Sequence, residues 1–242
     1  MSPRIFLLED VFDKDIVSIK GDNARYISTV LRCNTGEPLT LLDNRGNSYS
    51  AVIVKSLPSE VVVRLTGKDE DIKTELPIDI TLAQAIPKGD KMDIIIQKAT
   101  ELGVKRIIPI VTERTEVRIT RRLNRWKEIA ISAAQQSRRL RIPEIESPVG
   151  FNSFMAEASS GIIFWEKSEN SLKKVIRDYK PGGSITIVIG PEGGFSDEEI
   201  KAASERGFQH VSLGPRILRA ETAAIVAVSI IQYELGDLQE DN

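Results

Sequence analysis

Apolar and polar residues alternate along the first part of the chain in the pattern of half-buried β-strands. Strands are predicted over residues 4–8, 37–43, 48–56 and 60–66, and the apolar spacing in 24–32 predicts a helix. Residues 43–47 (DNRGN) are a predicted hairpin loop, because asparagine and glycine accept the positive φ of short turns. We therefore expect a small β-rich domain over residues 1–70, with the charged segment 67–77 as the linker.

From residue 78 the pattern changes to strands and helices in alternation. Strands are predicted over residues 78–85, 105–111, 161–165, 184–189 and 211–213, and helices over 90–102, 121–138, 171–179, 196–207 and 221–235. Ser196 and Glu199 have the spacing of a capping box, which opens a helix that we expect to end at Gly207. Because this alternation is typical of a parallel sheet covered by helices, the sequence predicts an α/β domain over residues 71–242.

Charge is balanced over the whole chain, with 33 Lys and Arg against 35 Asp and Glu and a formal net charge of −2. The whole-molecule field therefore does not indicate a polyanionic partner. Basic residues nevertheless gather between residues 118 and 141, opposed there only by Glu128: Arg118, Arg121, Arg122, Arg125, Lys127, Arg138, Arg139 and Arg141. This basic stripe suits a local nucleic-acid contact, and a solvated helix face explains the run equally well.

Cys33 is the single cysteine and His210 the single histidine, which excludes an internal disulfide and a His/Cys metal cluster. We interpret His210 as a structural or surface residue and expect no metal. No apolar run approaches the ~20 residues that cross a bilayer, and the first residues lack the pattern of a signal peptide. We expect a cytoplasmic protein without a membrane segment.

Two glycine-bearing segments, 190–194 (GPEGG) and 213–222 (LGPRILRAET), each follow an apolar run and each lead into a predicted helix. Open α/β sheets bind ligands where such loops meet at the carboxyl ends of parallel strands. The first loop lacks the Lys-Ser/Thr of a phosphate-binding loop and the dinucleotide spacing, and its carboxylates repel phosphate. It therefore favours a ligand without phosphates or a cationic one, with a tight structural turn as the alternative.

The second loop places Arg216 and Arg219 in a short segment whose fold does not require them. Arginine is unfavourable at a helix N-terminus, whereas Glu221 is favourable there and could be a first-turn stabiliser only. The helix behind, 221–235, is apolar nearly all round, which predicts burial in the core or against a second subunit.

At these residues the chain resembles the SPOUT class of S-adenosylmethionine-dependent methyltransferases, and more narrowly the 16S ribosomal RNA uridine-N3 methyltransferase family. The likeness includes Arg4-Ile5-Phe6, Val30-Leu31-Arg32 with Gly36, residues 43–46, residues 97–104 (QKATELGV), Glu113-Arg114, Trp126, Arg139, residues 141–144 and both glycine loops. It implies a PUA-like β-barrel followed by an α/β domain whose C-terminal segment threads a trefoil knot. It also implies a homodimer with the knot at its interface.

The resemblance implies that S-adenosylmethionine is held largely by backbone groups of three loops: Trp165, Glu166, Ile189, Gly190, Pro191, Glu192, Gly193, Gly194, Leu213, Gly214, Ile217 and Leu218. The partner it implies is 16S rRNA, within the small ribosomal subunit. We assign RNA binding to Arg4, Arg32, Arg114, Arg118, Arg138, Arg139 and Arg141. For catalysis we select Arg219 to stabilise the charge that develops on uracil, with Glu221 as orienting partner or proton acceptor; water is an equal candidate for the base.

Two positions depart from the family pattern: Tyr26 stands where a histidine is common, and Gln135 where a glutamate often precedes Gln136. Two alternative functions remain open on the sequence. One is a SPOUT methyltransferase for another rRNA or tRNA position, and the other is a non-catalytic RNA-binding protein with a decayed site. Both glycine loops match the family's pattern, which argues against decay.

Overall fold

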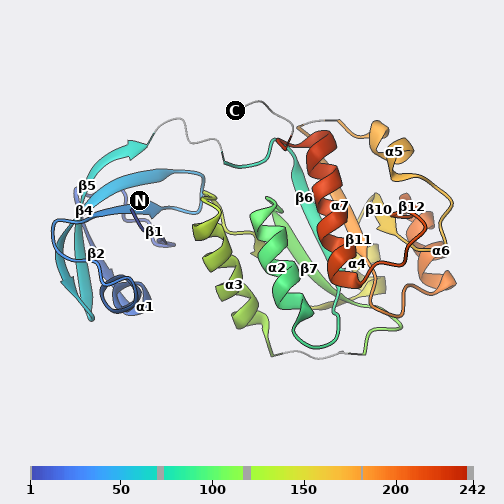
Figure 1. Ribbon diagram of the computed structural model, residues 1–242, viewed down its shortest axis with the longest axis horizontal. Coiled ribbons are helices and arrows are strands. Elements are labelled where there is room, and N and C mark those ends of the chain that lie inside the picture. Colours follow the sequence, from blue (N-terminus) through green and yellow to red (C-terminus); the bar gives the residue numbers. More distant parts are fainter. Residues whose placement is uncertain (1, 70–73, 117–120, 181, 239–242) are drawn as a thin grey trace. The chain divides into compact units, whose positions relative to one another are not determined.

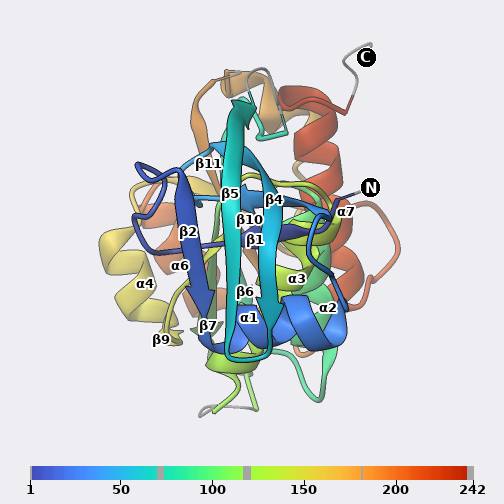
Figure 2. The ribbon, with the colours of Figure 1, turned by 90° about the vertical axis from the view of Figure 1, so that its left-hand side faces the viewer.

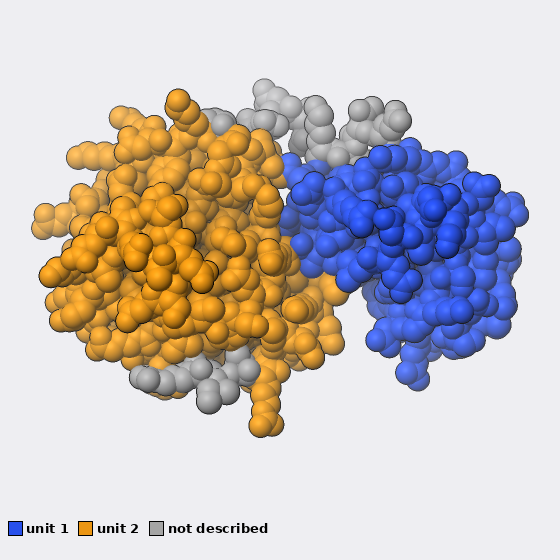
Figure 3. Space-filling model, turned by 180° about the vertical axis from the view of Figure 1, so that it is seen from behind, with its two compact units in different colours: residues 1–75, 134–142 blue, residues 76–133, 143–242 orange. Residues whose placement is uncertain are grey.

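The computed structural model describes residues 2–69, 74–116, 121–180 and 182–238. The chain divides into two compact units, unit 1 made of Met1–Glu75 with Ala134–Ile142 and unit 2 of Leu76–Ala133 with Pro143–Asn242 (Figure 3). The predicted domain boundary at residue 70 lies outside the described residues and stays a prediction.

Unit 1 is built on a five-stranded sheet in the order β1-β3-β4-β5-β2 (Figure 2). Its strands are β1 (Arg4–Phe6), β2 (Ile16–Lys20), β3 (Pro38–Leu42), β4 (Ser48–Leu57) and β5 (Glu60–Asp69), and its helices are α1 (Gly21–Arg25) and a π-helix (Tyr26–Val30). β1 pairs in parallel with β3, and the other pairs are antiparallel. Within the described residues the edge strands β1 and β2 do not pair with each other, so the sheet is an open half-barrel. The β-barrel expected for this part of the chain is thus a half-barrel sheet.

The hairpin between β3 and β4 has the predicted turn chemistry. The Asp43 carboxylate accepts hydrogen bonds from the backbone N–H groups of Arg45 (2.8 Å) and Asn47 (3.0 Å). Asn44 and Gly46 adopt positive φ values of 58° and 103°. The prediction for residues 43–47 is confirmed, because the residues that accept this backbone occupy the positions that need it.

Residues 139–141, in the segment 134–142 of unit 1, are hydrogen-bonded to Glu75 of the same unit. Its Oε1 accepts hydrogen bonds from the N–H groups of Leu140 (2.8 Å) and Arg141 (3.0 Å), and its Oε2 accepts one from Arg139 Nη2 (2.8 Å). The Arg139 side chain is only 4% exposed. A buried guanidinium needs such a carboxylate partner, so Arg139 is a structural residue of unit 1.

Unit 2 contains a parallel sheet in the order β12-β10-β11-β6-β7-β8, with β9 also paired to β7 (Figure 1). The strands are β6 (Asp79–Ala85), β7 (Arg106–Val111), β8 (Glu144–Ile145), β9 (Val149–Gly150), β10 (Gly161–Phe164), β11 (Ser184–Ile189) and β12 (Phe208–Val211). The helices of this part of the chain are α2 (Lys91–Glu101), α3 (Leu123–Gln136), α4 (Phe151–Glu157), α5 (Leu172–Val175) with a 3₁₀ turn (Ile176–Asp178), α6 (Asp197–Glu205) and α7 (Ala220–Leu235). The predicted α/β domain with a parallel sheet is confirmed.

Helices cover both faces of this sheet. On one face α7 packs against α2 and β11, and on the other α4 packs against α6 and β7 (Figure 1). The second face has a buried core that includes Ile108, Phe154, Val188 and Phe195. α6 begins at the predicted capping box, in which Ser196 Oγ accepts from Glu199 N and the Glu199 carboxylate accepts from Ser196 N. Among the described residues, no helix combines the length and apolar character needed to cross a membrane.

Candidate functional site

Three loops meet at the carboxyl edge of the sheet, because β10, β11 and β12 are parallel neighbours. They surround a cavity of about 360 Å³. Every residue predicted to hold the cofactor lines it: Trp165, Glu166, Ile189, Gly190, Pro191, Glu192, Gly193, Gly194, Leu213, Gly214, Ile217 and Leu218. Arg219 lines it too, and so do Phe164, Phe195, Arg216, Ala220 and Ala223, which the motifs had not assigned to the cofactor site. Phe164, Phe195 and Arg216 are direct sequence neighbours of predicted cofactor residues, and this adjacency is the feature of the sequence from which they could have been predicted.

A larger cavity of about 570 Å³ lies elsewhere in unit 2. Its lining includes the amino ends of strands, with Asp79, Arg106 and Ser184, and none of the predicted site residues. The smaller cavity is the better candidate site, because ligands of parallel α/β sheets bind at the carboxyl ends of the strands.

The GPEGG loop is held in a tight turn, with the N–H of Gly194 donating to the carbonyl of Pro191 at 3.0 Å. Gly194 has a φ of +70°, and a Cβ atom there would lie 3.0 Å from Glu166 Oε1. A Cβ on Gly190 would lie 3.0 Å from the buried ring of Phe195. A side chain would be crowded at both positions, and the positive φ of Gly194 also favours glycine. The loop therefore presents a closely fixed backbone to the cavity.

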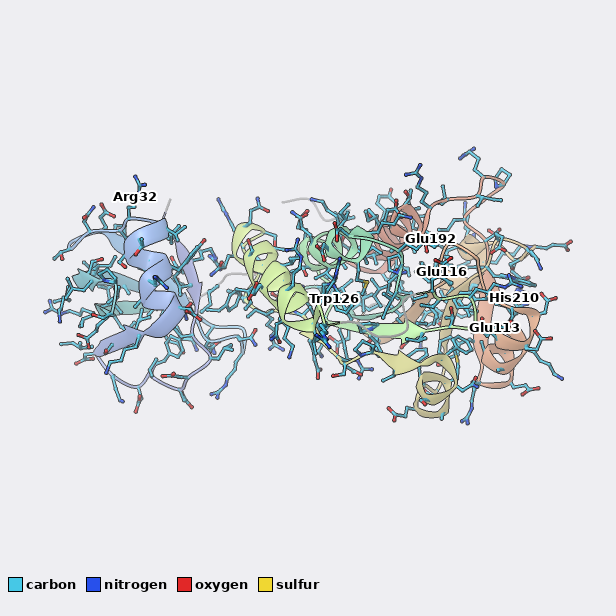
Figure 4. All side chains as sticks on the ribbon, turned by 90° about the horizontal axis from the view of Figure 1, so that it is seen from below. Arg32, Glu113, Glu116, Trp126, Glu192 and His210 are labelled. Carbon is cyan, nitrogen blue, oxygen red and sulfur yellow. The ribbon has the colours of Figure 1, made fainter. Side chains whose placement is uncertain are left out.

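Glu192 is tied to the start of α2 (Figure 4). Its Oε1 accepts hydrogen bonds from Lys91 Nζ at 2.6 Å and from the backbone N–H of Lys88 at 3.2 Å. Burial alone would raise the pKa of this carboxyl, but the hydrogen bonds from Lys91 and Lys88 and the charge of Lys91 outweigh it, so the pKa lies below its ordinary value of 4.5. Glu192 thus stays ionised at neutral pH, and its hydrogen bonds hold the GPEGG loop against the β6–α2 connection.

Replacing Lys91 by methionine should weaken this tie in a pH-dependent way. The folded-state pKa of Glu192 is depressed, so its contribution to stability is present above its ordinary pKa and disappears as pH falls through the folded value. We expect the variant to lose at most about 1 kcal/mol of unfolding free energy at pH 7, since the pair is partly solvated. Urea denaturation at pH 7 and about pH 3 measures the difference, which should close in acid.

Lys201→Met on α6 is the matched control, because Lys201 is an exposed lysine on another helix of the same unit. A deficit of Lys91→Met that stays equal at both pH values would contradict the role given to the ion pair.

Arg219 and Glu221 are placed differently. Arg219 is the N-cap of α7, where its carbonyl accepts from Ala223 N at 2.8 Å, and its exposed side chain lines the cavity. Glu221 lies in the first turn of α7 and is not part of the cavity lining. Its Oε2 is buried and has no hydrogen-bond partner among the described residues. The structure therefore brings Arg219, but not Glu221, to the cavity.

Trp165 joins the cavity to the single histidine. The Trp165 and His210 rings meet edge to face at 5.7 Å, and Lys167 Nζ lies 5.6 Å from the indole centroid. His210 Nδ1 shares a 2.9 Å hydrogen bond with Ser168 Oγ. These contacts fit a structural role for His210. Within the described part of the chain, no group of three or more His, Cys, Asp or Glu side chains could hold a metal ion.

The predicted RNA-binding arginines of unit 1 have several environments. Arg32 and Arg141 are exposed, and Arg141 Nη2 donates to the carbonyl of Arg45 at 2.9 Å. Arg4 Nη2 donates to the carbonyl of exposed Arg138 at 3.3 Å, and burial, followed by the charge of Arg138, lowers the pKa of Arg4. Arg139 was also predicted to bind RNA, but its side chain is buried against Glu75, which argues against a contact with RNA.

In unit 2, Arg114 Nη1 donates to the carbonyl of Gly193 at 2.9 Å, so this arginine supports the GPEGG loop. Arg122 pairs with Asp90, and Arg125 Nε pairs with Asp93 at 2.8 Å. These two members of the basic stripe therefore have carboxylate partners. Arg118 lies outside the described residues.

Comparison with known proteins identifies both parts of the chain. Residues 19–66 match the RNA methyltransferase PUA domain family, and residues 74–232 match the RNA methyltransferase domain family. Ribosomal RNA small subunit methyltransferase E from Buchnera aphidicola is 33% identical over 245 residues, which covers 98% of this chain and 95% of that protein. The corresponding enzyme from Bacillus subtilis is 32% identical over 93% of this chain and 92% of its own length.

Solved structures agree with this match. The structure of ribosomal RNA small subunit methyltransferase E from Neisseria gonorrhoeae bound to S-adenosyl methionine superposes with a TM-score of 0.91 at 35% identity, covering 99% of this chain and 100% of that chain. A methyltransferase from Legionella pneumophila in complex with the same cofactor gives a TM-score of 0.89 at 37% identity, covering 98% of this chain and 100% of that chain. The resemblance carried by the motifs is thereby confirmed, and the chain belongs to the ribosomal RNA small subunit methyltransferase E family of SPOUT-class RNA methyltransferases.

Proposed function

We propose that the protein transfers a methyl group from S-adenosylmethionine to N3 of a uridine in 16S ribosomal RNA within the small subunit. One observation carries the proposal: the three loops that the family resemblance assigns to the cofactor line a single cavity. The relatives that align over nearly the whole chain are small-subunit rRNA methyltransferases, which supports the substrate class.

The cavity suits the cofactor in size and chemistry. Its volume of about 360 Å³ lies in the range of small-molecule sites. The lining combines glycine backbones with apolar side chains such as Phe164 and Leu218, and it includes the carboxylate of Glu166. Trp165 contributes a buried indole N–H with no partner among the described residues, which is a donor available to a ligand. When bound, S-adenosylmethionine supplies an electrophilic methyl group on a cationic sulfonium, and these residues would hold it.

Arg219 acts on the base to be methylated. Uracil N3 carries a proton and is paired in a duplex, so the base must first be unpaired at a cost of a few kcal/mol. Loss of the N3 proton leaves negative charge on the ring, and the cationic guanidinium of Arg219 stabilises that charge from the cavity wall. Because Glu221 lies off the cavity lining, its proposed role is to orient Arg219, and its buried Oε2 without a hydrogen-bond partner among the described residues supports a polar role. Water is then the acceptor of the proton.

The proposal includes two features of SPOUT architecture. The C-terminal segment threads a trefoil knot, which is supported by the membership of the chain in a SPOUT-class family. The protein is a homodimer, supported by the outer side of α7, where Ile225, Val226 and Ile230 are only half-buried and Tyr233 is 53% exposed. Sedimentation equilibrium tests the dimer, and a monomer at micromolar concentration would contradict it.

Residues 1–70 serve as the RNA-binding domain and residues 71–242 as the methyltransferase domain in this proposal, supported by the family matches to residues 19–66 and 74–232. A cytoplasmic location follows from the ribosomal substrate. Fusing a reporter to the full chain and following it through cell fractionation tests the location.

The exposed arginines of unit 1 predict a salt-dependent RNA affinity. Replacing Arg138 and Arg141 together by glutamine should flatten the plot of log affinity against log salt by about 0.7 for each phosphate that the variant no longer neutralises. Filter binding of the full-length protein to naked 16S rRNA over a salt series measures the slope. Lys173→Gln/Lys174→Gln on α5 is the matched control, because both lysines are exposed. An unchanged slope in the arginine variant would show that Arg138 and Arg141 are solvated surface residues that do not contact RNA phosphates.

The experiment that tests the function is methyl transfer from labelled S-adenosylmethionine to small ribosomal subunits and to naked 16S rRNA, followed by reverse transcription. A methyl group on uracil N3 blocks base pairing, so we expect a strong stop at one uridine. Label without a stop would indicate a ribose or another non-pairing position, which is the alternative SPOUT activity. Failure to bind the cofactor would favour a non-catalytic RNA-binding protein.

A further inference from the structure

The helical segment of unit 1 exposes a mixed aromatic, aliphatic and cationic face. α1 and the π-helix that follows it are anchored through Ala24 and Ile27, which are fully buried in the core of unit 1. On the solvent side, Tyr26 is 38% exposed and Val30 is 65% exposed, and Arg25 is exposed next to them. The solvent side of an amphipathic helix normally carries polar residues. Tyr26 and Val30 are therefore unusual there, since neither belongs to the core cluster of unit 1.

The backbone that carries this face is well fixed. The N–H of Leu31 donates to the carbonyl of Tyr26 at 2.9 Å, and the N–H of Cys33 donates to the carbonyl of Ile27 at 3.0 Å. Arg32 adopts a φ of +56°, which is uncommon for a residue other than glycine. π-helical turns and left-handed non-glycine residues are concentrated at functional sites. In Figure 4 the labelled Arg32 side chain projects outward beyond the end of the helical segment.

Charge also points to this face. Residues 20–32 contain three cations, Lys20, Arg25 and Arg32, against the single carboxylate of Asp22. Of Val30, Leu31 and Arg32, only Leu31 packs against the core, so the valine and the arginine at the end of the helical segment remain in solvent.

We propose that Tyr26, Val30, Arg25 and Arg32 form a docking platform for single-stranded RNA. A splayed base stacks on the Tyr26 ring and contacts Val30, while the two guanidinium groups meet the adjacent phosphates. Single-stranded RNA is recognised in this way, by aromatic side chains that stack on unpaired bases and by arginines that follow the backbone. The inference rests on the proposed rRNA substrate and adds the surface through which unit 1 holds that substrate.

The first test compares Tyr26→Ala with Tyr26→Phe in the full-length protein. Removing the stacked ring should weaken binding of a labelled single-stranded RNA by about 5- to 100-fold and raise the KM for RNA, with kcat retained at saturating RNA. Tyr26→Phe should restore binding, because a phenyl ring stacks as well. Val30→Ala should show a smaller loss, and Val54→Ala on β4 is its control, since Val54 is also exposed at 41%.

The second test addresses charge. Arg25→Gln/Arg32→Gln should reduce the slope of log affinity against log salt by about 0.7 per arginine on single-stranded RNA. Calorimetric titration with S-adenosylmethionine should give unchanged affinity in all these variants, because the platform and the cofactor cavity draw on different residues.

Each outcome decides the proposal. Equal RNA affinity of Tyr26→Ala and Val54→Ala would overturn it, and so would a loss that Tyr26→Phe does not repair. A Tyr26→Ala defect seen with assembled subunits but not with naked RNA would overturn it in favour of a protein partner. If the wild-type protein binds single-stranded RNA through these residues but methylates none, the platform stands and the proposed function fails.

Discussion

Replacing Arg219 by alanine is expected to lower the rate of methyl transfer by about 10²- to 10³-fold, while the affinity for S-adenosylmethionine changes little. Arg219 is the exposed N-cap of α7 and its side chain lines the cavity, so it can reach a base brought to the cofactor. Its positive charge acts on the negative charge that develops at uracil N3, which is present in the transition state and absent from the free cofactor complex. Single-turnover kinetics give the rate, and calorimetric titration gives the cofactor affinity.

Arg216→Ala is the matched control, because Arg216 is an exposed arginine of the same loop and also lines the cavity. We expect a smaller effect there. Arg219→Lys should recover only part of the rate, since lysine keeps the charge but lacks the planar fork of donors. Equal losses of rate and cofactor affinity in Arg219→Ala would show that the residue builds the pocket instead.

Replacing Glu75 by alanine is expected to lower the free energy of unfolding by about 3 kcal/mol, the lower end of the range for breaking a buried ion pair. Glu75 accepts from two backbone N–H groups and from Arg139, whose side chain is 4% exposed. Glu75 itself is 24% exposed, which places the effect at the lower end. Urea denaturation at pH 7, followed by circular dichroism, measures the loss.

Glu9→Ala is the control, since Glu9 is an exposed carboxylate of the same unit, and it should change stability by less than about 0.5 kcal/mol. Glu75→Gln should fall between the two, because the amide oxygen still accepts hydrogen bonds but the charge is lost. Unfolding of Glu75→Ala at the same urea concentration as the wild type would contradict the structural role given to the ion pair with Arg139.

Local patterns predicted much of the fold because their causes are local. Ser196 and Glu199 formed the capping box at the start of α6, and Asp43 with Asn44 and Gly46 formed the expected hairpin. β6, β7, β10 and β11 were found because buried parallel strands are continuous apolar runs. The last strand was predicted over residues 211–213 but runs from Phe208 to Val211, and the two-residue strands β8 and β9 were not predicted. β2 was not predicted, although Ile16–Lys20 alternates between exposed and buried positions, because only two of its five residues reach the core. α4 was also missed, as it is only seven residues long.

At the site, the glycine loops and the residues after β10 were predicted correctly as neighbours, since parallel strands end at a common edge. The tie of Glu192 to Lys91 could not be predicted, because 101 residues separate the two in sequence. The basic stripe was also only partly resolved by the sequence. Arg122 pairs with Asp90 before α2, and Arg125 pairs with Asp93 within α2. Neither the spacing nor the composition of the sequence indicates that these two carboxylates are the partners.

The sequence by itself determined the α/β class of the larger unit, the family, and the loops that surround the cavity. These depend on apolar periodicity, glycine and motif residues that are close together in the chain. Only the tertiary structure decided that Arg139 is buried, that residues 134–142 belong with unit 1, that the small sheet stays open and that Glu221 lies off the cavity lining. Each of these features depends on contacts between segments that are distant in the sequence. Such contacts bury some charged side chains, which then stabilise the fold, and leave others exposed, where they can bind a ligand.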